Sequence, residues 1–221
     1  MIIPIVAMVD GRKAVVFDGD DLLKANQNAP AEITGNNPYK IIYTVWNESI
    51  ASDEEVFYWA KRGTNNRHTA VCYGSNSIYG AVAHWGTSAD MGFDRGVPQA
   101  HSWHTIAVTY QGGTNGAEYV LTNGQINSNE IKTLDIWPNN PMTVGSAYDG
   151  DPDVPPGTIT PVYFFSGALA KLEVYNVYVR PANLAMIVTT PVNINGDFII
   201  DFRDVALFAN NWMAGPVLLG N

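Results

Sequence analysis

Cysteine is almost absent from this sequence, and its absence excludes several kinds of chemistry. The only cysteine among the 221 residues is Cys72, so no disulfide can form within the chain. Without a second cysteine there is no Cys-x-x-Cys or Cys-x-x-Cys-His motif, which excludes thiol-redox and covalent-haem functions. Cys72 itself lies in a strand-like run of apolar residues, and we expect it to be a small buried hydrophobic side chain.

Basic residues and long apolar runs are also scarce. The chain has 12 Lys and Arg against 21 Asp and Glu, a net charge of −9. This charge repels phosphate backbones and anionic membrane surfaces, so nucleic acid is not an expected partner. No apolar run reaches the roughly 18 residues of a membrane span, so membrane insertion is not expected. Residues 1–9 lack the basic region and cleavage site of a signal peptide. We expect that an export signal has been removed or that the chain begins inside a larger protein.

Short β-strand patterns replace the helical periodicity that is rare before residue 180. Runs of β-branched and aromatic residues recur between clusters of Gly, Asn and Pro. Residues 103–110 alternate between two faces, as a sandwich strand requires. Asn123-Gly124, between two such runs, predicts a two-residue hairpin. The pattern predicts an all-β protein with strands at residues 13–17, 39–46, 55–61, 69–73, 79–84, 103–110, 117–122, 125–127, 142–145 and 167–175.

Five segments carry a family resemblance through their order along the chain. They read AVVFDGDD, WHTIAVTY, YVLTNG, TVG and FSGALAKLEVYN, at residues 14–21, 103–110, 119–124, 143–145 and 165–176. Together they resemble laminin-G-like, concanavalin-A-like jelly-roll domains over residues 10–187. The resemblance implies a two-sheet antiparallel sandwich that recognises glycans or other extracellular partners. Residues 180–187 match the short helical tail that closes many such domains.

The carboxylate pattern of a sandwich glycosidase is absent. Glycoside hydrolases of this architecture place paired carboxylates on one strand face in a Glu-x-Asp-x-x-Glu motif, which does not occur here. Asp53, Glu54 and Glu55 form the densest acidic cluster, but neighbouring side chains on a strand point to opposite faces, so we interpret the cluster as a solvated strand entry. The glycine-rich residues 111–116 precede a strand rather than a helix, which does not support a phosphate-binding loop. We therefore predict no enzymatic activity.

Aromatic and polar residues in the expected turns are the candidates for glycan binding. Sugar recognition needs an aromatic platform for the ring face and a few amide or carboxylate groups for the hydroxyls. Each candidate could instead be a simple turn former or a packed aromatic side chain. We predict a site at one rim of the sandwich from Asn65, Asn66, Arg67, His84, Trp85, Asp90, Asp94, Tyr148 and Asp149.

Twelve residues near the C-terminus have the oxygen spacing of a calcium loop. An EF-hand-type loop supplies ligands from positions 1, 3, 5, 7, 9 and 12, with a backbone carbonyl at position 7. The residues that follow, 202–212, place most of their apolar side chains on one helical face, and the position-9 aspartate can cap that helix. The loop ligands would be Asn193, Asn195, Asp197, the carbonyl of Ile199, Asp201 and Asp204.

This loop and helix resemble a dockerin-type calcium repeat over about 20 residues. Position 1 is Asn193 where the family has Asp, and position 6 is Phe198 where the family has Gly, so we expect weaker calcium binding than in an ideal loop. The second repeat that dockerins use to hold a cohesin is absent, so cohesin docking is not carried over. The alternative is an Asn/Asp/Gly turn that only caps the helix.

A second calcium site within the sandwich is a separate question. Members of the laminin-G-like family often hold a structural calcium through an acidic residue where this chain has Lys171, which cannot ligate a cation at neutral pH. Asp18, Asp20 and Asp21 could still form a site together with backbone carbonyls.

We therefore interpret the chain as a jelly-roll sandwich, residues 1–187, followed by a calcium-loop-plus-helix unit, residues 188–221. The predicted function is a non-catalytic binding or adhesion module of a secreted or bacterial cell-surface protein, with a glycan or extracellular protein as partner and calcium as structural cofactor. The alternative is a structural subunit of a self-assembling extracellular fibre or surface layer, because residues 2–9 and 216–219 are apolar ends without partners in these motifs. We expect residues 2–9 or 216–219 to be ordered by contact with another part of the protein or with a second copy, and residues 2–9 could serve as an outer strand of the sandwich.

Overall fold

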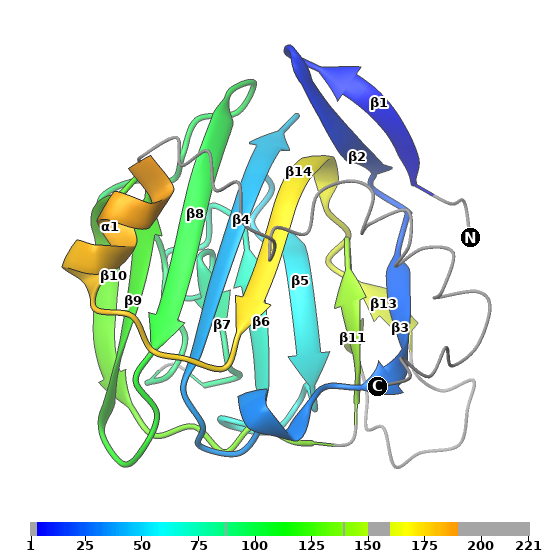
Figure 1. Ribbon diagram of the computed structural model, residues 1–221. Helices are drawn as coiled ribbons and strands as arrows, with labels where there is room; N and C mark the ends of the chain where they lie inside the picture. The colour runs from blue at the N-terminus through cyan, green and yellow to red at the C-terminus, as the bar shows by residue number, and fades with distance from the viewer. Residues whose placement is uncertain (1–3, 87, 139, 150–159, 190–221) are drawn as a thin grey trace, which may run out of the picture.

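Two antiparallel sheets stack face to face in this protein, as the all-β pattern predicts. The computed structural model describes residues 4–86, 88–138, 140–149 and 160–189 (Figure 1). The larger sheet has seven strands in the order β1-β2-β14-β4-β8-β9-β10. Their bounds are β1 Ile5–Val9, β2 Arg12–Asp18, β14 Ser166–Tyr175, β4 Tyr39–Asn47, β8 Trp103–Tyr110, β9 Gly116–Thr122 and β10 Gln125–Lys132.

The smaller sheet has five strands in the order β3-β11-β5-β6-β7. Their bounds are β3 Leu23–Asn28, β11 Pro141–Val144, β5 Glu55–Ala60, β6 His68–Cys72 and β7 Val82–Ala83. A separate two-stranded ladder pairs β12, Ala147–Asp149, with β13, Thr160–Val162. The remaining elements are the 3-10 turn η1, Ala31–Ile33, and the helix α1, Pro181–Thr189.

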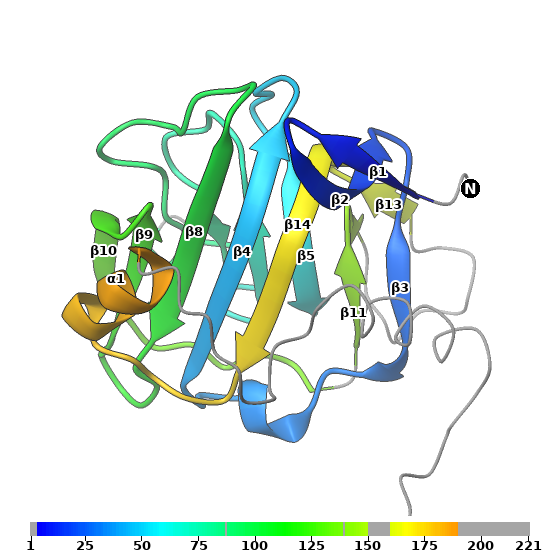
Figure 2. The same ribbon diagram turned by 45° about the horizontal axis from the view of Figure 1, so that its top comes forward.

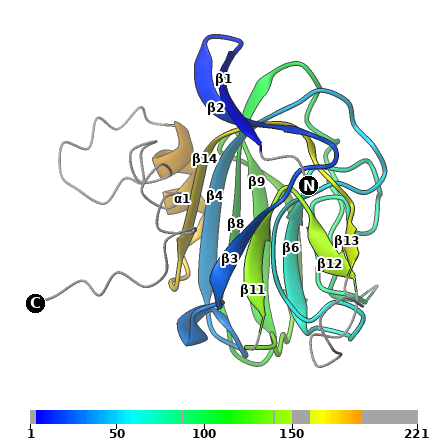
Figure 3. The same ribbon diagram turned by 90° about the vertical axis from the view of Figure 1, so that its right-hand side faces the viewer.

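The helix and the small ladder lie on opposite outer sides of the sandwich. Seen edge-on, α1 lies outside the seven-stranded sheet and β12–β13 lie outside the five-stranded sheet (Figure 3). The helix crosses β8 and β9, which it contacts (Figure 2). No helix in the described ranges is long and apolar enough to span a membrane.

The core between the sheets follows from strand alternation. On β4, Tyr39, Ile41, Tyr43 and Val45 all point into the core, as a period of two requires. From the five-stranded sheet, Trp59 meets Tyr39 edge-on, with ring centres 5.4 Å apart. Such edge-to-face pairs add to the stabilisation from burial alone.

A buried polar group joins the two sheets. Glu118 on β9 accepts a hydrogen bond from the Lys132 ammonium at 2.9 Å and lies 3.0 Å from Nε2 of His84, which follows β7. The Tyr39 hydroxyl donates to the second oxygen of Glu118. A buried carboxylate is tolerated when its partners are complete. Burial would raise the pKa of Glu118, but Lys132 and His84 lower it to about 2.

The structure confirms the expected strands and adds three that were not expected. All ten expected strand regions coincide with strands, and Asn123-Gly124 forms the β9–β10 hairpin with φ of 50° and 80°. The helical tail expected at residues 180–187 is α1. The strands not expected are β3, β12 and β13, whereas β1 realises the outer strand considered for residues 2–9.

The outer strand is ordered by pairing with β2, but most of its side chains are not buried within this chain, and burial against a second copy stays a prediction. Ile5, Val6 and Met8 of β1 are 64%, 54% and 68% exposed, because β1 ends the sheet and its hairpin with β2 projects from the sandwich (Figure 1). The expected unit at residues 188–221 begins inside α1, and residues 190–221 lie outside the described residues. The two-part division therefore stays a prediction.

Candidate functional site

A carboxylate holds the turn that presents Trp85. Trp85 follows β7 and has φ of 64°, in the left-handed region that bulky residues rarely adopt. Asp90 brackets it: Oδ1 accepts the His84 N–H at 2.5 Å and Oδ2 accepts the Gly86 N–H at 3.0 Å. The Trp85 side chain is nevertheless 40% exposed. The turn therefore keeps a large aromatic ring at the surface despite the backbone strain.

The guanidinium of Arg62 lies between two aromatic rings. Its Cζ is 5.1 Å from the centre of the Trp85 ring and 4.2 Å from that of Tyr163. Tyr163 is also left-handed, with φ of 55°. Arg62 is buried and pairs with the Glu55 carboxylate on β5. Cation–π contacts of this kind are strongest where water is excluded. Arg62 thus fixes two aromatic side chains and one carboxylate in a single cluster.

A buried histidine lies next to Trp85. His68 on β6 is fully buried, with its ring centre 5.7 Å from Tyr58 and 6.4 Å from Trp85. Neither ring nitrogen has a hydrogen-bond partner within the described part of the chain. Burial, with smaller contributions from His84 and Arg62, lowers the pKa of His68 well below its usual value. The imidazole is therefore neutral at pH 7.

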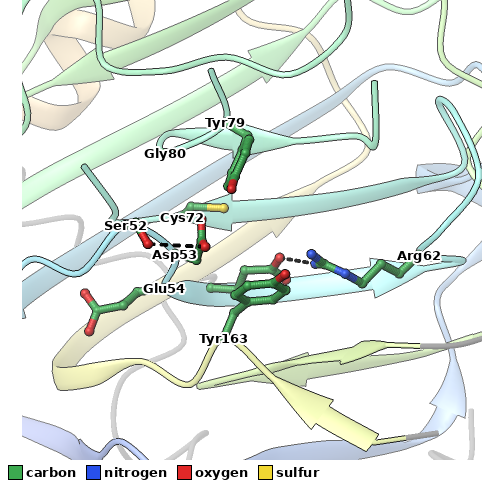
Figure 4. Close-up of a pocket in the computed structure, with 9 residues that line it drawn as sticks. Ser52, Asp53, Glu54, Arg62, Cys72, Tyr79, Gly80 and Tyr163 are labelled. Atoms are coloured by element: carbon green, nitrogen blue, oxygen red, sulfur yellow. Dashed lines mark hydrogen bonds and ion pairs between the residues drawn. The ribbon is translucent and has the colours of Figure 1, made fainter. Parts of the chain in front are cut away.

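A small pocket opens beside this cluster. Its enclosed space is about 10 Å³, room for one water-sized group, and Figure 4 shows Tyr79, Asp53 and Tyr163 around it. The Ser52 hydroxyl donates to Asp53 at 3.3 Å. Burial and then a hydrogen bond with Asp53 raise the pKa of Tyr79 to about 12, so its hydroxyl stays protonated. The lining residues are Ser52, Asp53, Glu54, Glu55, Arg62, Cys72, Tyr79, Gly80 and Tyr163.

The acidic residues of the pocket diverge, as strand alternation predicts. Glu54 points away from the pocket (Figure 4) and accepts from Asn47 Nδ2 at 2.7 Å. Glu55 turns to Arg62. The interpretation of the whole cluster as a solvated strand entry is wrong, because Glu54 and Glu55 are buried. Cys72 is buried as expected, and burial raises the pKa of its thiol well above the usual value.

A second tryptophan lies beside the same β5–β6 loop. Lys61 Nζ is 5.2 Å and Arg67 Cζ 5.7 Å from the centre of the Trp137 ring. Arg67 also pairs with Asp135 at 2.7 Å. Residues 61–67 therefore supply one cation to Trp85 and two to Trp137.

Several of the residues predicted to bind a glycan come together at this loop. The Asn66 N–H donates to the His84 carbonyl at 2.9 Å, which places the β5–β6 loop against the Trp85 turn. Asn65 lies against Gly86, since a Cβ added to that glycine would be 3.6 Å from Asn65 Cγ. Asn65, Asn66 and Asp90 therefore lie next to the Trp85 turn, whereas Arg67 of the same loop contacts Trp137 and Asp135. Asp90 itself is occupied in holding the turn.

Other predicted ligand residues lie elsewhere. His84 is a correction: its side chain is fully buried against Glu118 and cannot meet a surface ligand. Asp94 lies beside β10, where its N–H donates to Ser128 Oγ at 3.0 Å. The backbone of Tyr148 and Asp149 forms part of β12, in the two-stranded ladder.

Sequence reasoning missed four residues of the cluster: Arg62, Tyr163, His68 and, within the pocket, Asp53 as a lining group. The contacts of Arg62 come from three separate chain segments, and no local pattern announces them. The available sequence signal for the site was an aromatic residue in a turn, Trp85 followed by Gly86. It pointed to the exposed ring but not to Arg62, which packs against that ring.

Three carboxylates lie together at the end of β2. One oxygen each of Asp18, Asp20 and Asp21 fall within 4.8 Å of one another. Asp21 is buried, and burial raises its pKa above the usual value. Its Oδ1 has no hydrogen-bond partner in the described ranges, whereas Oδ2 accepts the Asp18 N–H at 3.3 Å. These oxygens are the donor type that calcium prefers.

The predicted C-terminal calcium loop, residues 193–204, lies outside the described residues. Within the sandwich, the Lys171 ammonium on β14 pairs with the Glu173 carboxylate at 3.0 Å.

No protein-family model matches this sequence, and no curated protein matches it. Among solved structures, domain 4 of an extracellular GH43 arabinanase from Geobacillus stearothermophilus, in complex with arabinotriose, has a TM-score of 0.61 at 17% identity, covering 85% of this chain and 82% of that one. A heptameric SAP-like pentraxin from Limulus polyphemus has a TM-score of 0.55 at 13% identity, covering 82% and 83%.

A third similar structure is a protein from Bacteroides ovatus described as a candidate carbohydrate-binding protein. Its TM-score is 0.54 at 14% identity, and the match covers 79% of this chain but only 46% of that one. Identities this low establish architecture and not activity. By its sheets and by these likenesses, the chain is an all-β protein with a two-sheet antiparallel jelly-roll sandwich.

Proposed function

We propose that this protein is a non-catalytic module that binds a glycan beside the five-stranded sheet, at Trp85 and the neighbouring pocket. The observation that carries the proposal is the Trp85 turn. An exposed ring is held on a left-handed backbone by Asp90 and supported by Arg62. Strained backbone persists only where its surroundings enforce it, and such strain concentrates at functional sites.

The chemistry of the site suits an uncharged sugar chain. The Trp85 ring offers an apolar face on which a pyranose or furanose ring can stack. In the adjoining pocket, Asp53 accepts hydrogen bonds from hydroxyls, and the Tyr79 oxygen, whose proton is directed to Asp53, can accept one. The Arg62 guanidinium is already paired with the Glu55 carboxylate, and the net charge of the chain is −9. Anionic sugars are therefore disfavoured as ligands.

A catalytic role is not supported by the pocket. A retaining glycosidase needs two carboxyl groups about 5 to 5.5 Å apart across the scissile bond. Here Glu54 turns away to Asn47 and Glu55 is bound to Arg62, which leaves Asp53 without an opposing carboxylate among the described lining residues.

The likenesses to known structures support the proposal at the level of the fold. One similar domain was solved with arabinotriose, and it belongs to an extracellular enzyme. We therefore place this protein outside the cell or at its surface, with a glycan as the preferred partner and an extracellular protein as the alternative.

Calcium remains part of the proposal as a structural cofactor. We assign it to the dockerin-like loop at residues 193–204, on the spacing of its oxygens. Residues 188–221 would then be a second, small unit after the sandwich.

The second candidate function is that of a structural subunit in an extracellular assembly. The observation that favours it is the exposed apolar strand β1 at the end of the seven-stranded sheet, through which copies can associate, although a fibre would need a second contact surface besides β1. An assembly subunit would form polymers, visible by negative-stain microscopy, without added sugar.

Binding to an array of neutral and acidic oligosaccharides, followed by calorimetry on the best ligand, tests the glycan function. We expect Trp85→Ala to weaken binding at least about tenfold, which is 1.4 kcal/mol. The matched control is Trp46→Ala, which removes a tryptophan from β4 in the other sheet. Circular dichroism verifies that both variants fold. Absence of any glycan ligand, or equal loss in both variants, would refute the proposal.

A further inference from the structure

The strand β1 leaves an apolar edge at the surface. It is the terminal strand of the seven-stranded sheet, paired with β2 on one side only among the described residues. Every side chain from Ile5 to Val9 is apolar, and three of the five are more than half exposed. The unpaired N–H and C=O groups of such a strand are a template for pairing with another strand.

The other sheet edges are protected in the ways that soluble proteins use. At the far end of the same sheet, β10 has a register shift at Ile126/Ser128 and carries Glu130 and Lys132. In the smaller sheet, β3 is polar along most of its length and β7 has only two residues. Bulges, charges and short edges all prevent pairing. Among the described edges β1 alone is longer than three residues and has neither bulge nor charge.

We propose that two copies of this chain pair through β1 in an antiparallel ladder centred on Ala7. In this register Val6 of one copy lies opposite Met8 of the other, and Ile5 opposite Val9. Both members of each pair lie on the same face of the joined sheet, because the paired positions differ by an even number of residues. All five positions are apolar, so no charge is left unpaired in the ladder.

The sequence limits on either side favour a second copy over a longer partner strand. Pro4 precedes β1 and offers no N–H for a ladder. Asp10 and Gly11, with φ of 42° and 77°, form the turn into β2 at the other end. The pairing segment is thus five residues long, and an antiparallel second copy of it pairs along its whole length.

Such a contact closes on itself. A two-fold interface uses the same surface on both subunits and leaves no free copy of it. Pairing through β1 therefore gives a dimer with one continuous sheet, and not a fibre. Five-residue strands bury little area, so the dimer belongs to the weak class, below about 1,200 Å² of total interface. Each copy carries −9, so we expect added salt to strengthen the dimer.

Sedimentation equilibrium across concentrations up to about 1 mM, where even weak association is measurable, tests the proposal. We expect the mass to rise from 24.1 kDa toward twice that value. The double variant Val6→Lys and Met8→Lys places like charges opposite each other and should remain monomeric. The variant Val6→Lys and Met8→Glu places opposite charges in the same pairs and should dimerise again.

A matched control is Ile131→Lys, which changes an apolar residue that is 61% exposed on the β10 edge. It should dimerise as the wild type does. A wild type that stays monomeric, association that survives the double lysine variant, or failure of the Lys/Glu variant to restore it overturns the proposal. The two double variants change the same exposed positions, so a folding defect would affect both and thermal melts would reveal it.

Discussion

The Glu118 carboxylate lies 2.9 Å from the Lys132 ammonium, and both side chains are buried inside the sandwich. Removing one partner of a buried pair leaves the other charge uncompensated. We expect Glu118→Gln to reduce the free energy of unfolding by about 3 to 5 kcal/mol, measured by urea denaturation at pH 7. Glu130→Gln on the neighbouring strand is the control, and a comparable loss there would contradict the special role of the buried pair.

The same group predicts an acid limb in stability. The pKa of Glu118 is about 2 in the folded protein against about 4.5 for an unperturbed glutamate, so its contribution to stability is present above pH 4.5 and is lost as the pH falls toward 2. Denaturation at several pH values should show a steeper fall for the wild type than for Glu118→Gln across this window. Parallel curves would contradict the assignment.

His68 predicts a second pH dependence in a different window. Burial lowers the pKa of His68 in the folded protein well below 6.5. Below pH 6.5 the unfolded chain therefore binds a proton that the folded protein does not, and the stability decreases as the pH is lowered. We expect His68→Phe, which retains a ring beside Tyr58 and Trp85, to be more stable than the wild type and to flatten the profile just below pH 6.5. A variant with the wild-type slope would show that His68 is not the titrating group.

Asp90 should affect ligand binding without touching the ligand. Asp90→Ala removes both acceptors of the turn around Trp85, and unsatisfied buried donors cost about 1 to 3 kcal/mol each. We expect lower thermal stability and weaker glycan affinity in calorimetry. Asp94→Ala, which removes the same charge on the same loop, should change affinity much less. Equal effects would mean that charge, and not the turn, matters.

The calcium proposal rests on Asp204, the position that completes the loop. We expect Asp204→Ala to abolish or strongly weaken calcium binding measured by calorimetry on the full chain, because position 12 supplies the closing carboxylate. Asp21→Ala is the control at the other acidic cluster. Unchanged affinity in Asp204→Ala would refute the loop assignment, and loss only in Asp21→Ala would move the site to the sandwich.

Local patterns were sufficient for most of the fold. The alternation in β8 and the Asn123-Gly124 turn are determined by neighbours in sequence, and both formed as predicted. The polar strand β3 was missed because Leu23–Asn28 has no apolar alternation, and it is recruited by pairing with β11. Tertiary pairing overrides weak local propensity in such edge strands.

The site was only half predictable for the same reason. Trp85 stood out as an aromatic residue in a turn. His84 next to it was misread, because its partner Glu118 is distant in sequence and its burial depends on the packing of two sheets. The support from Arg62 likewise depends on Tyr163, which no local pattern connects to it.

The sandwiching of Arg62 between Trp85 and Tyr163 also sets an order of events during folding. Its two aromatic neighbours come from segments after β7 and after β13, so their contact requires closure of long loops, which is slow. We therefore expect the stack to form after most strands have paired. In a refolding experiment, ligand-binding competence should therefore appear later than the change in intrinsic tryptophan fluorescence that accompanies formation of the core.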